Sequence, residues 1–191
     1  MTPGHLVPGG ESRTELRIGN SRFIGTAGPA ATVGEVRALL ARLRGEFPDA
    51  SHHAYAFAVG VGARQTHGMR DDGEPSGTAG RPMLAVVQGS GLGDVVVVAT
   101  RYFVGSKLGT GGLVRAYSGT AKAVLAFLAT SEKVATASVQ FSLPYEFLVR
   151  AGLLRTRAEG QIETEPLASW SRCRCGCART GWRSAAWPWG S

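Results

Sequence analysis

Glycines and cationic residues alternate closely between Thr100 and Tyr117, and their order is typical of an anion-binding segment. It reads Thr-Arg-Tyr-Phe-Val-Gly-Ser-Lys-Leu-Gly-Thr-Gly-Gly-Leu-Val-Arg-Ala-Tyr. Glycines let a ligand approach the backbone, and a helix that begins beside them offers unpaired N–H donors and a partial positive charge. The candidate anion or nucleic-acid contacts are Arg101, Lys107, Gly109, Gly111, Gly112 and Arg115.

The same glycines would also let a helix pack closely against a strand, so a purely structural interpretation stays open. Known nucleotide loops do not fit the segment. Lys107 precedes the later glycines, whereas a P-loop lysine follows them. The fingerprint of a dinucleotide-binding loop is absent as well.

A second candidate segment places three carboxylates in one short loop, at Asp71, Asp72 and Glu74. Clustered carboxylates can bind Mg²⁺ or Ca²⁺, or act as an acid–base pair. They can equally cap a helix or pair with nearby arginines such as Arg70 and Arg81. The loop therefore has a possible metal-binding interpretation and a structural one.

Histidines and cysteines complete the inventory of reactive side chains without indicating an enzyme. His52, His53 and His67 lack the spacing of a zinc-hydrolase motif, and no nucleophile elbow is present. The cysteines at 173, 175 and 177 lack the two-residue gap of ordinary zinc knuckles, so a metal clip stays an alternative. We assign no catalytic residue, no metal ligand and no cofactor.

Hydrophobic periodicity predicts an α/β (α+β) fold that positions both segments. Strands are expected at 13–18, 21–27, 54–61, 66–70 and 94–103, and helices at 33–46, 78–88 and 113–128. This order indicates one mixed sheet covered by helices. The run Val95–Val98 is typical of a central strand that is buried on both faces.

A second unit is expected after residue 131, with a strand at 133–143, a helix at 145–157 and a strand at 161–165. Residues 166–191 hold all four tryptophans and all three cysteines, without recognisable periodicity. We interpret that tail as atypical, from a shifted reading frame or a degenerate C-terminus. The expected divisions are a flexible segment 1–12, a domain 13–130, a partial domain 132–165 and the tail 166–191.

The formal charge is +7 and the isoelectric point about 9.9. Basic surfaces attract phosphate polyanions, although this charge could also serve only solubility. The longest apolar run, Val95–Ala99, is far too short to span a bilayer, and no leader pattern opens the chain. A cytoplasmic location without a membrane partner is therefore expected.

A set of short motifs spread over residues 13–130 has a highly specific order. They are Ser21–Ile24, His52–Tyr55, Asp71–Pro75, Gly77–Gly80, Thr100–Phe103 and Lys107–Tyr117. In this combination the chain resembles the IMPACT/YigZ family. It departs from the family at Val104-Gly105, where paired glycines are usual.

The resemblance implies a ribosomal-protein-like first domain, as in domain IV of elongation factor G, followed by an incomplete ferredoxin-like second domain. Eukaryotic relatives are linked to translational control under amino-acid starvation. The expected function is a translation-associated regulatory protein that binds RNA or the ribosome through its basic glycine-rich loop. Two alternatives remain: a module that binds a protein partner of the translation machinery, and a metal-assisted enzyme acting on a small phosphorylated or peptide substrate.

Overall fold

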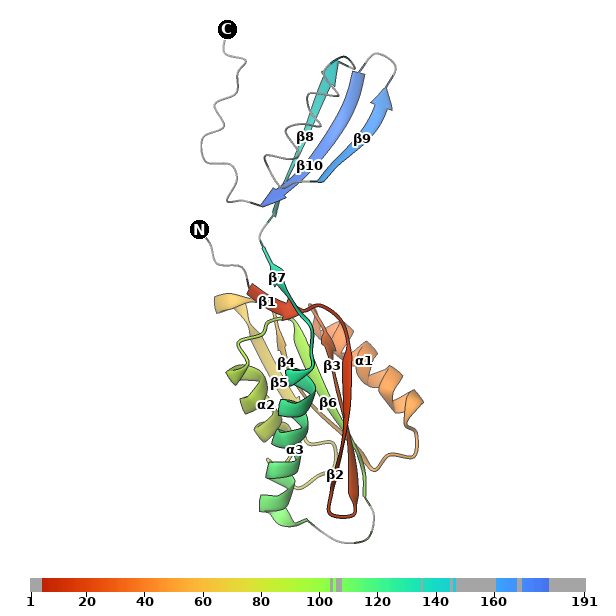
Figure 1. Ribbon diagram of the computed structural model, residues 1–191, viewed down its shortest axis with the longest axis vertical. Helices are drawn as coiled ribbons and strands as arrows, with labels where there is room; N and C mark the ends of the chain where they lie inside the picture. The colour runs from red at the N-terminus through yellow and green to blue at the C-terminus, as the bar shows by residue number, and fades with distance from the viewer. Residues whose placement is uncertain are drawn as a thin grey trace. The chain divides into compact units, whose positions relative to one another are not determined.

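The computed structural model describes residues 5–103, 105, 108–134, 136–144, 146, 161–167 and 170–178. The chain forms two compact units, one from His5 to Lys133 and one that begins at Val134 (Figure 1). The candidate site lies in the first unit.

A five-stranded sheet forms the centre of the first unit. Its strands, in spatial order, are β2 (Ser12–Ile18), β3 (Ser21–Pro29), β6 (Val95–Tyr102), β4 (His52–Val59) and β5 (Thr66–Arg70). Every neighbouring pair is antiparallel, so the prediction of a mixed sheet is wrong. The reason is that β6 inserts between β3 and β4, which run parallel to each other without pairing.

Helices cover both faces of this sheet (Figure 1). The helices α2 (Gly80–Gly89) and α3 (Gly109–Ala126) pack on one face, and α1 (Val33–Glu46) packs on the other. Alternate residues of β6 serve the two cores: Val95 and Val97 face α2 and α3, whereas Val96 and Val98 face α1. This arrangement confirms the central, doubly buried strand that the valine run predicts.

Most predicted elements of the first unit are confirmed, and α1 and β5 have their predicted bounds. The largest difference concerns α3, which begins at Gly109 rather than at Leu113. A further strand, β1 (His5–Pro8), lies in the segment expected to be flexible. It pairs with β7 (Thr130–Lys133), and this pairing supplies the order that its composition does not predict. A short 3₁₀ turn, η1 (Gly62–Arg64), precedes β5.

The second unit contains an antiparallel sheet in its described part. The strands β8 (Thr136–Pro144), β10 (Trp170–Ala178) and β9 (Gln161–Leu167) follow one another in that spatial order. The central strand β10 falls where no strand was predicted. Apart from Glu146, the predicted helix at 145–157 lies outside the described residues. Among the helices that the structure describes, none is long and apolar enough to cross a membrane.

Candidate functional site

Within the described residues, the first turn of α3 lacks a capping side chain. Its N-cap residue Leu108 makes no side-chain hydrogen bond to the helix, and no acidic residue occupies the first turn. Gly109, Thr110 and Gly111 are exposed. The first N–H groups of a helix have no partner within it, and they carry partial positive charge. An anion could therefore approach this helix end directly.

The structure requires glycine at some positions of this turn and not at others. Gly109 adopts a φ of +70°, a left-handed conformation that favours glycine. A Cβ at Gly112 would lie 3.1 Å from the Cβ of Leu108, whereas a Cβ at Gly111 would meet no atom within 4 Å. Close strand–helix packing therefore does not explain Gly111. As far as the described residues go, open space in front of its Cα leaves the backbone accessible to a ligand.

The three predicted cationic contacts differ in their positions. Arg115 is exposed on α3, one turn beyond the glycines. Lys107 lies outside the described residues. Arg101 lies inside the unit and is only 4% exposed. Thus the sequence-predicted residues that the structure brings together at an accessible surface are the glycines and Arg115.

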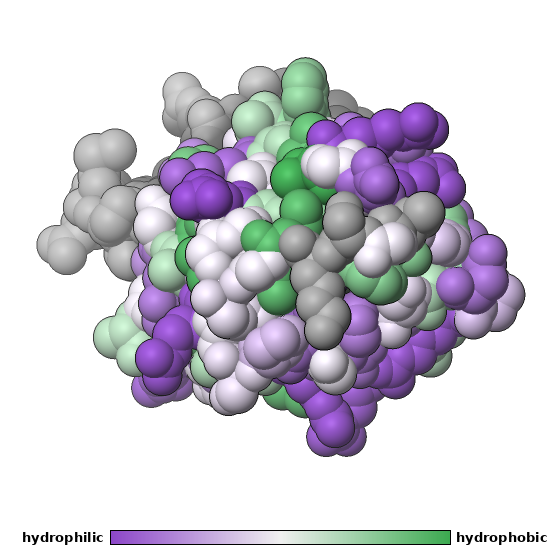
Figure 2. Space-filling model, turned by 90° about the horizontal axis from the view of Figure 1, so that it is seen from below, coloured by the Kyte–Doolittle hydropathy of each residue, from purple (hydrophilic) through white to green (hydrophobic). Residues whose placement is uncertain are grey.

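Figure 2 shows the first unit from the end at which α3 begins. Hydrophobic side chains gather near the middle of this face, and hydrophilic side chains surround them. Val114, between the glycines and Arg115, contributes an exposed apolar side chain. The helix start therefore carries an exposed apolar side chain beside the exposed charge of Arg115.

Arg101 is held by a buried network that joins the two candidate segments. Its Nη1 atom donates to Oε1 of Glu74 at 2.5 Å, and its Nη2 atom donates to Oγ of Ser21 at 3.1 Å. The hydroxyl of Tyr117 donates to the same Glu74 oxygen at 2.6 Å. The acid loop is thus connected to both β6 and α3.

Aromatic rings enclose the Arg101 guanidinium. Its carbon lies 5.4 Å from the ring centre of Phe23 and 5.2 Å from that of Phe103, distances at which cation–π attraction operates. The Nε atom is buried without a hydrogen-bond partner among the described residues. Burial raises the pKa of Tyr117, and its hydrogen bond to the Glu74 carboxylate raises that pKa further. Tyr117 therefore stays a neutral donor at every physiological pH.

Asp71 caps α2 from the preceding loop. Its carboxylate accepts hydrogen bonds from the N–H groups of Gly77 at 2.8 Å, Ala79 at 3.0 Å and Gly80 at 2.7 Å. Burial alone would raise the pKa of Asp71, but these three donors together hold it below its usual value. The carboxylate satisfies N–H donors that would otherwise lack a partner. The N-cap residue of α2 is an alanine, which has no side-chain acceptor.

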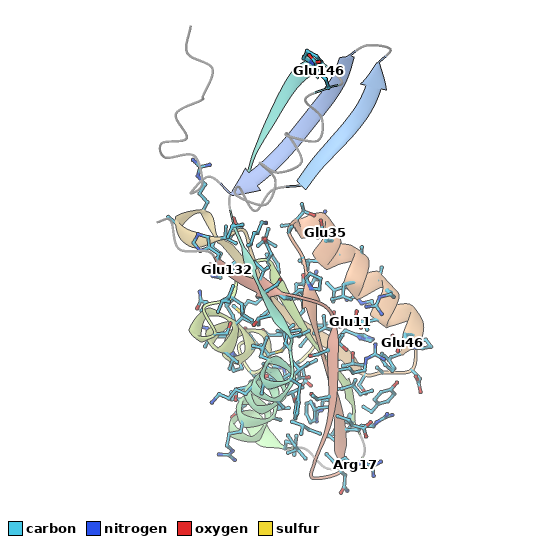
Figure 3. All side chains as sticks on the ribbon, turned by 45° about the horizontal axis from the view of Figure 1, so that its top comes forward. Glu11, Arg17, Glu35, Glu46, Glu132 and Glu146 are labelled. Carbon is cyan, nitrogen blue, oxygen red and sulfur yellow. The ribbon has the colours of Figure 1, made fainter. Side chains whose placement is uncertain are left out.

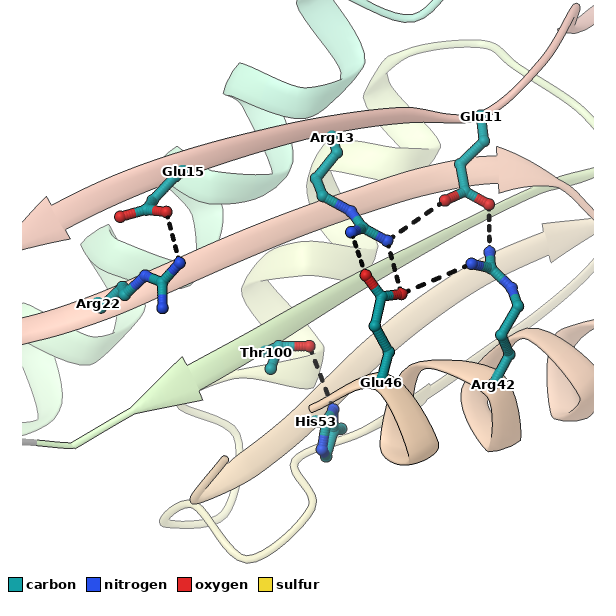
Figure 4. A network of polar contacts seen from close by, with 8 residues as sticks. All are labelled: Glu11, Arg13, Glu15, Arg22, Arg42, Glu46, His53 and Thr100. Atoms are coloured by element: carbon teal, nitrogen blue, oxygen red, sulfur yellow. Dashed lines mark hydrogen bonds and ion pairs between the residues drawn. The ribbon is translucent and has the colours of Figure 1, made fainter. Parts of the chain in front are cut away.

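Asp72 ties the loop to β4 and α1. Its Oδ2 atom accepts from the N–H of His53 at 2.8 Å, and its Oδ1 atom pairs with Nη2 of Arg44 at 2.9 Å. Its carbonyl oxygen accepts from Nδ1 of His52 at 2.9 Å. His53 lies beneath, with Nδ1 3.1 Å from Oγ1 of Thr100 (Figure 4).

The three carboxylates thus point to three different sets of protein donors. They do not converge on one point, and the described residues contain no group of three or more acidic, histidine or cysteine side chains arranged to hold a metal ion. Of the two interpretations of the acid loop, this geometry favours the structural one.

Many of the protein's cations are neutralised on the opposite side of the sheet. Glu11 on the chain leading into β2 and Glu46 on α1 lie beside each other (Figure 3). Arg13 and Arg42 bridge these two carboxylates (Figure 4). By contrast, no ion pair is formed by Arg115 within the described residues. On the α2–α3 side, Arg115 therefore keeps a positive charge that no described carboxylate neutralises.

Tyr117 was not among the functional side chains predicted from the sequence. The available signal was its position in the same motif as Arg101, together with a hydroxyl that needs a partner when buried. Ser21 was missed in the same way. Both supply polar contacts to a buried ion pair.

Comparisons with known proteins identify the family of this chain. The Impact N-terminal domain family matches residues 19–125. IMPACT family member YigZ of Escherichia coli is 38% identical over 158 residues, covering 82% of this chain and 78% of that protein. An IMPACT family member of Thermus thermophilus is 43% identical, covering 73% and 75%. A crystal structure of a hypothetical protein matches with a TM-score of 0.71 and 34% identity, covering 94% of this chain and 88% of that one.

Proposed function

Because the chain belongs to the IMPACT family, we propose that it is a translation-associated regulatory protein that binds RNA phosphates at the first turn of α3. The translational context comes from the family resemblance, including the expected likeness to elongation factor G domains. The phosphate chemistry comes from the helix start. The observation that carries it is Gly111, an exposed glycine that neither backbone strain nor packing requires.

Binding would occur mainly through the backbone. The N–H groups of Gly109, Thr110 and Gly111 would donate to phosphate oxygens, and the helix dipole would favour the negative charge. Arg115 and Lys107 would add full charges beside this turn. Phosphate contacts orient a nucleic acid without reading its bases, so we expect little sequence preference. Structured RNA such as ribosomal or transfer RNA fits this chemistry.

Arg101 has an indirect role in this proposal. Enclosed by Glu74 and aromatic rings, its guanidinium joins β6 to the acid loop, and Tyr117 joins the same carboxylate to α3. The network therefore fixes α3 relative to the sheet. A rigid helix start costs less conformational entropy when it binds a ligand.

A matched pair of alanine substitutions tests the proposal. Gly111→Ala adds a methyl group at the open helix start, and Gly119→Ala adds one to the same helix, again with no atom within 4 Å. Both changes should stabilise α3, by roughly 0.5–1 kcal/mol, because alanine is a better helix former than glycine. Only the first should obstruct RNA.

Fluorescence anisotropy with labelled transfer RNA measures the difference at low salt. We expect Gly111→Ala to weaken binding about tenfold and Gly119→Ala to leave it unchanged. Equal affinities of the two variants would count against the α3 site. A complete lack of binding by the unmodified protein would reject RNA as the partner.

A further inference from the structure

A groove between α2 and α3 lies on the outer side of the helical layer, away from the sheet. Its volume is about 710 Å³, and it is open to solvent. Pro82, Ala85 and Val86 line it from α2, and Ser118, Lys122 and Leu125 line it from α3. The two helices pack beside each other on one face of the sheet (Figure 1). Small side chains on both walls keep the groove shallow and accessible.

The two helices that line this groove carry charges of one sign. Neither α2 nor α3 contains aspartate or glutamate, and their charged residues are Arg81, Arg115 and Lys122. Lys122 is exposed within the otherwise uncharged lining. No acidic partner of Lys122 occurs among the described residues. An occupant with carboxylates would therefore meet complementary charge.

A large exposed apolar side chain follows the last lining residue in the sequence. Phe127 directly follows the lining residue Ala126 and is 76% exposed, the highest exposure of any large hydrophobic residue in the described part. An exposed aromatic residue is the type of anchor that protein partners bury. The lining itself includes no aromatic side chain, so it offers no stacking surface for nucleic-acid bases.

We propose that the α2–α3 groove binds an acidic amphipathic helix of a protein partner. The partner's apolar stripe would lie against Val86 and Leu125, and a carboxylate on its flank would pair with Lys122. The helix α2 has ten residues and is about 15 Å long, which matches roughly three turns of a bound helix. Helix-in-groove recognition uses apolar anchors at this spacing. This site is separate from the RNA site proposed at the start of α3.

The test uses the full chain and two designed 14-residue peptides. Both peptides carry the same leucine stripe at helical spacing, with glutamates on the flanks of one and lysines on the flanks of the other. Amide shifts of the ¹⁵N-labelled protein locate the contact, and fluorescence anisotropy gives affinities. We expect the acidic peptide to bind and to shift amides of α2 and α3, and the lysine peptide to bind far more weakly.

Two substitutions in the groove sharpen the test. Lys122→Glu should lower the affinity of the protein for the acidic peptide about threefold to tenfold and raise its affinity for the lysine peptide. Ala85→Trp places a large side chain in the groove from an exposed position and should lower the affinity for both peptides. Arg37→Glu makes the same charge reversal at an exposed position of α1 and should change neither affinity.

Three results would overturn the proposal. They are absence of binding by the acidic peptide, shifts confined to another surface, and an affinity that Lys122→Glu leaves unchanged. If labelled RNA rather than the peptide shifts the groove amides, the groove is a nucleic-acid surface instead. Gly111→Ala should leave peptide affinity unchanged, so failure of the RNA site and failure of the groove can be told apart.

Discussion

At the scale of single residues, two arginines from one motif have different environments and should have different energetic roles. Arg101 is buried with Glu74, whereas Arg115 is exposed. Removing one partner of a buried ion pair leaves an uncompensated charge and costs about 3–5 kcal/mol. We expect Arg101→Met to lower the free energy of unfolding by that amount, and Arg115→Met to change it by less than about 0.5 kcal/mol.

Urea unfolding followed by circular dichroism measures this difference. Tryptophan fluorescence would not serve, because all four tryptophans lie beyond residue 166, in the second unit. Equal stabilities of the two variants would mean that the Arg101 guanidinium is solvated, contrary to the structure.

His53 should make the first unit sensitive to mild acid. Burial lowers the pKa of its imidazole; Asp72 opposes this effect and Arg44 reinforces it. The unfolded chain therefore binds a proton near the ordinary pKa of 6.5, while the folded chain resists protonation. Stability is complete above about pH 6.5 and decreases as the pH falls below it.

The variant His53→Gln should show a flatter dependence of unfolding free energy on pH between 7 and 5. His67→Gln, which removes an exposed imidazole from β5, is the control. If His53→Gln has the same slope as the unmodified protein, acid sensitivity has another source.

At the scale of elements, the first turn of α2 depends on a residue from outside the helix. Asp71→Ala removes the acceptor of three backbone N–H groups, and replacing a capping side chain by alanine costs about 0.5–2 kcal/mol. Amide hydrogen exchange should become faster at Gly77, Ala79 and Gly80. Asp49→Ala, at an exposed acid, should leave these amides unchanged.

The elements predicted best are those in which the hydrophobic period and the capping residues indicate the same structure. The helix α1 has apolar residues at helical spacing and a threonine cap, and its bounds were predicted correctly. The start of α3 was missed because a run of glycines disfavours helix. Packing of Leu113 and Tyr117 against the sheet outweighs that preference.

Burial of Arg101 could have been predicted from strand alternation. It shares its parity with Val95, Val97 and Ala99, which face α2 and α3. The prediction of an exposed contact instead relied on the charge of Arg101. Its partner Glu74 lies too far away in the sequence for a local pattern to reveal the ion pair. The strand β10 was also missed, although its cysteines recur with the period of two that strands require.

At the scale of the whole molecule, the net charge is +7, but ion pairs leave the cationic side chains unequally available to a ligand. Arg13 and Arg42, beside α1, are paired with glutamates, whereas α2 and α3 contain no acidic residue. A polyanion should therefore meet the helical side of the first unit. We expect RNA phosphates to bind there, at the start of α3.

Binding of labelled ribosomal RNA across a salt series tests this claim most directly. The logarithm of the association constant should fall linearly with the logarithm of salt concentration, because bound phosphates release counterions. In Lys107→Ala/Arg115→Ala the slope should be shallower by roughly 1.5–2, as expected for two lost phosphate contacts. An unchanged slope in the double variant, or binding that is indifferent to salt, would contradict the account.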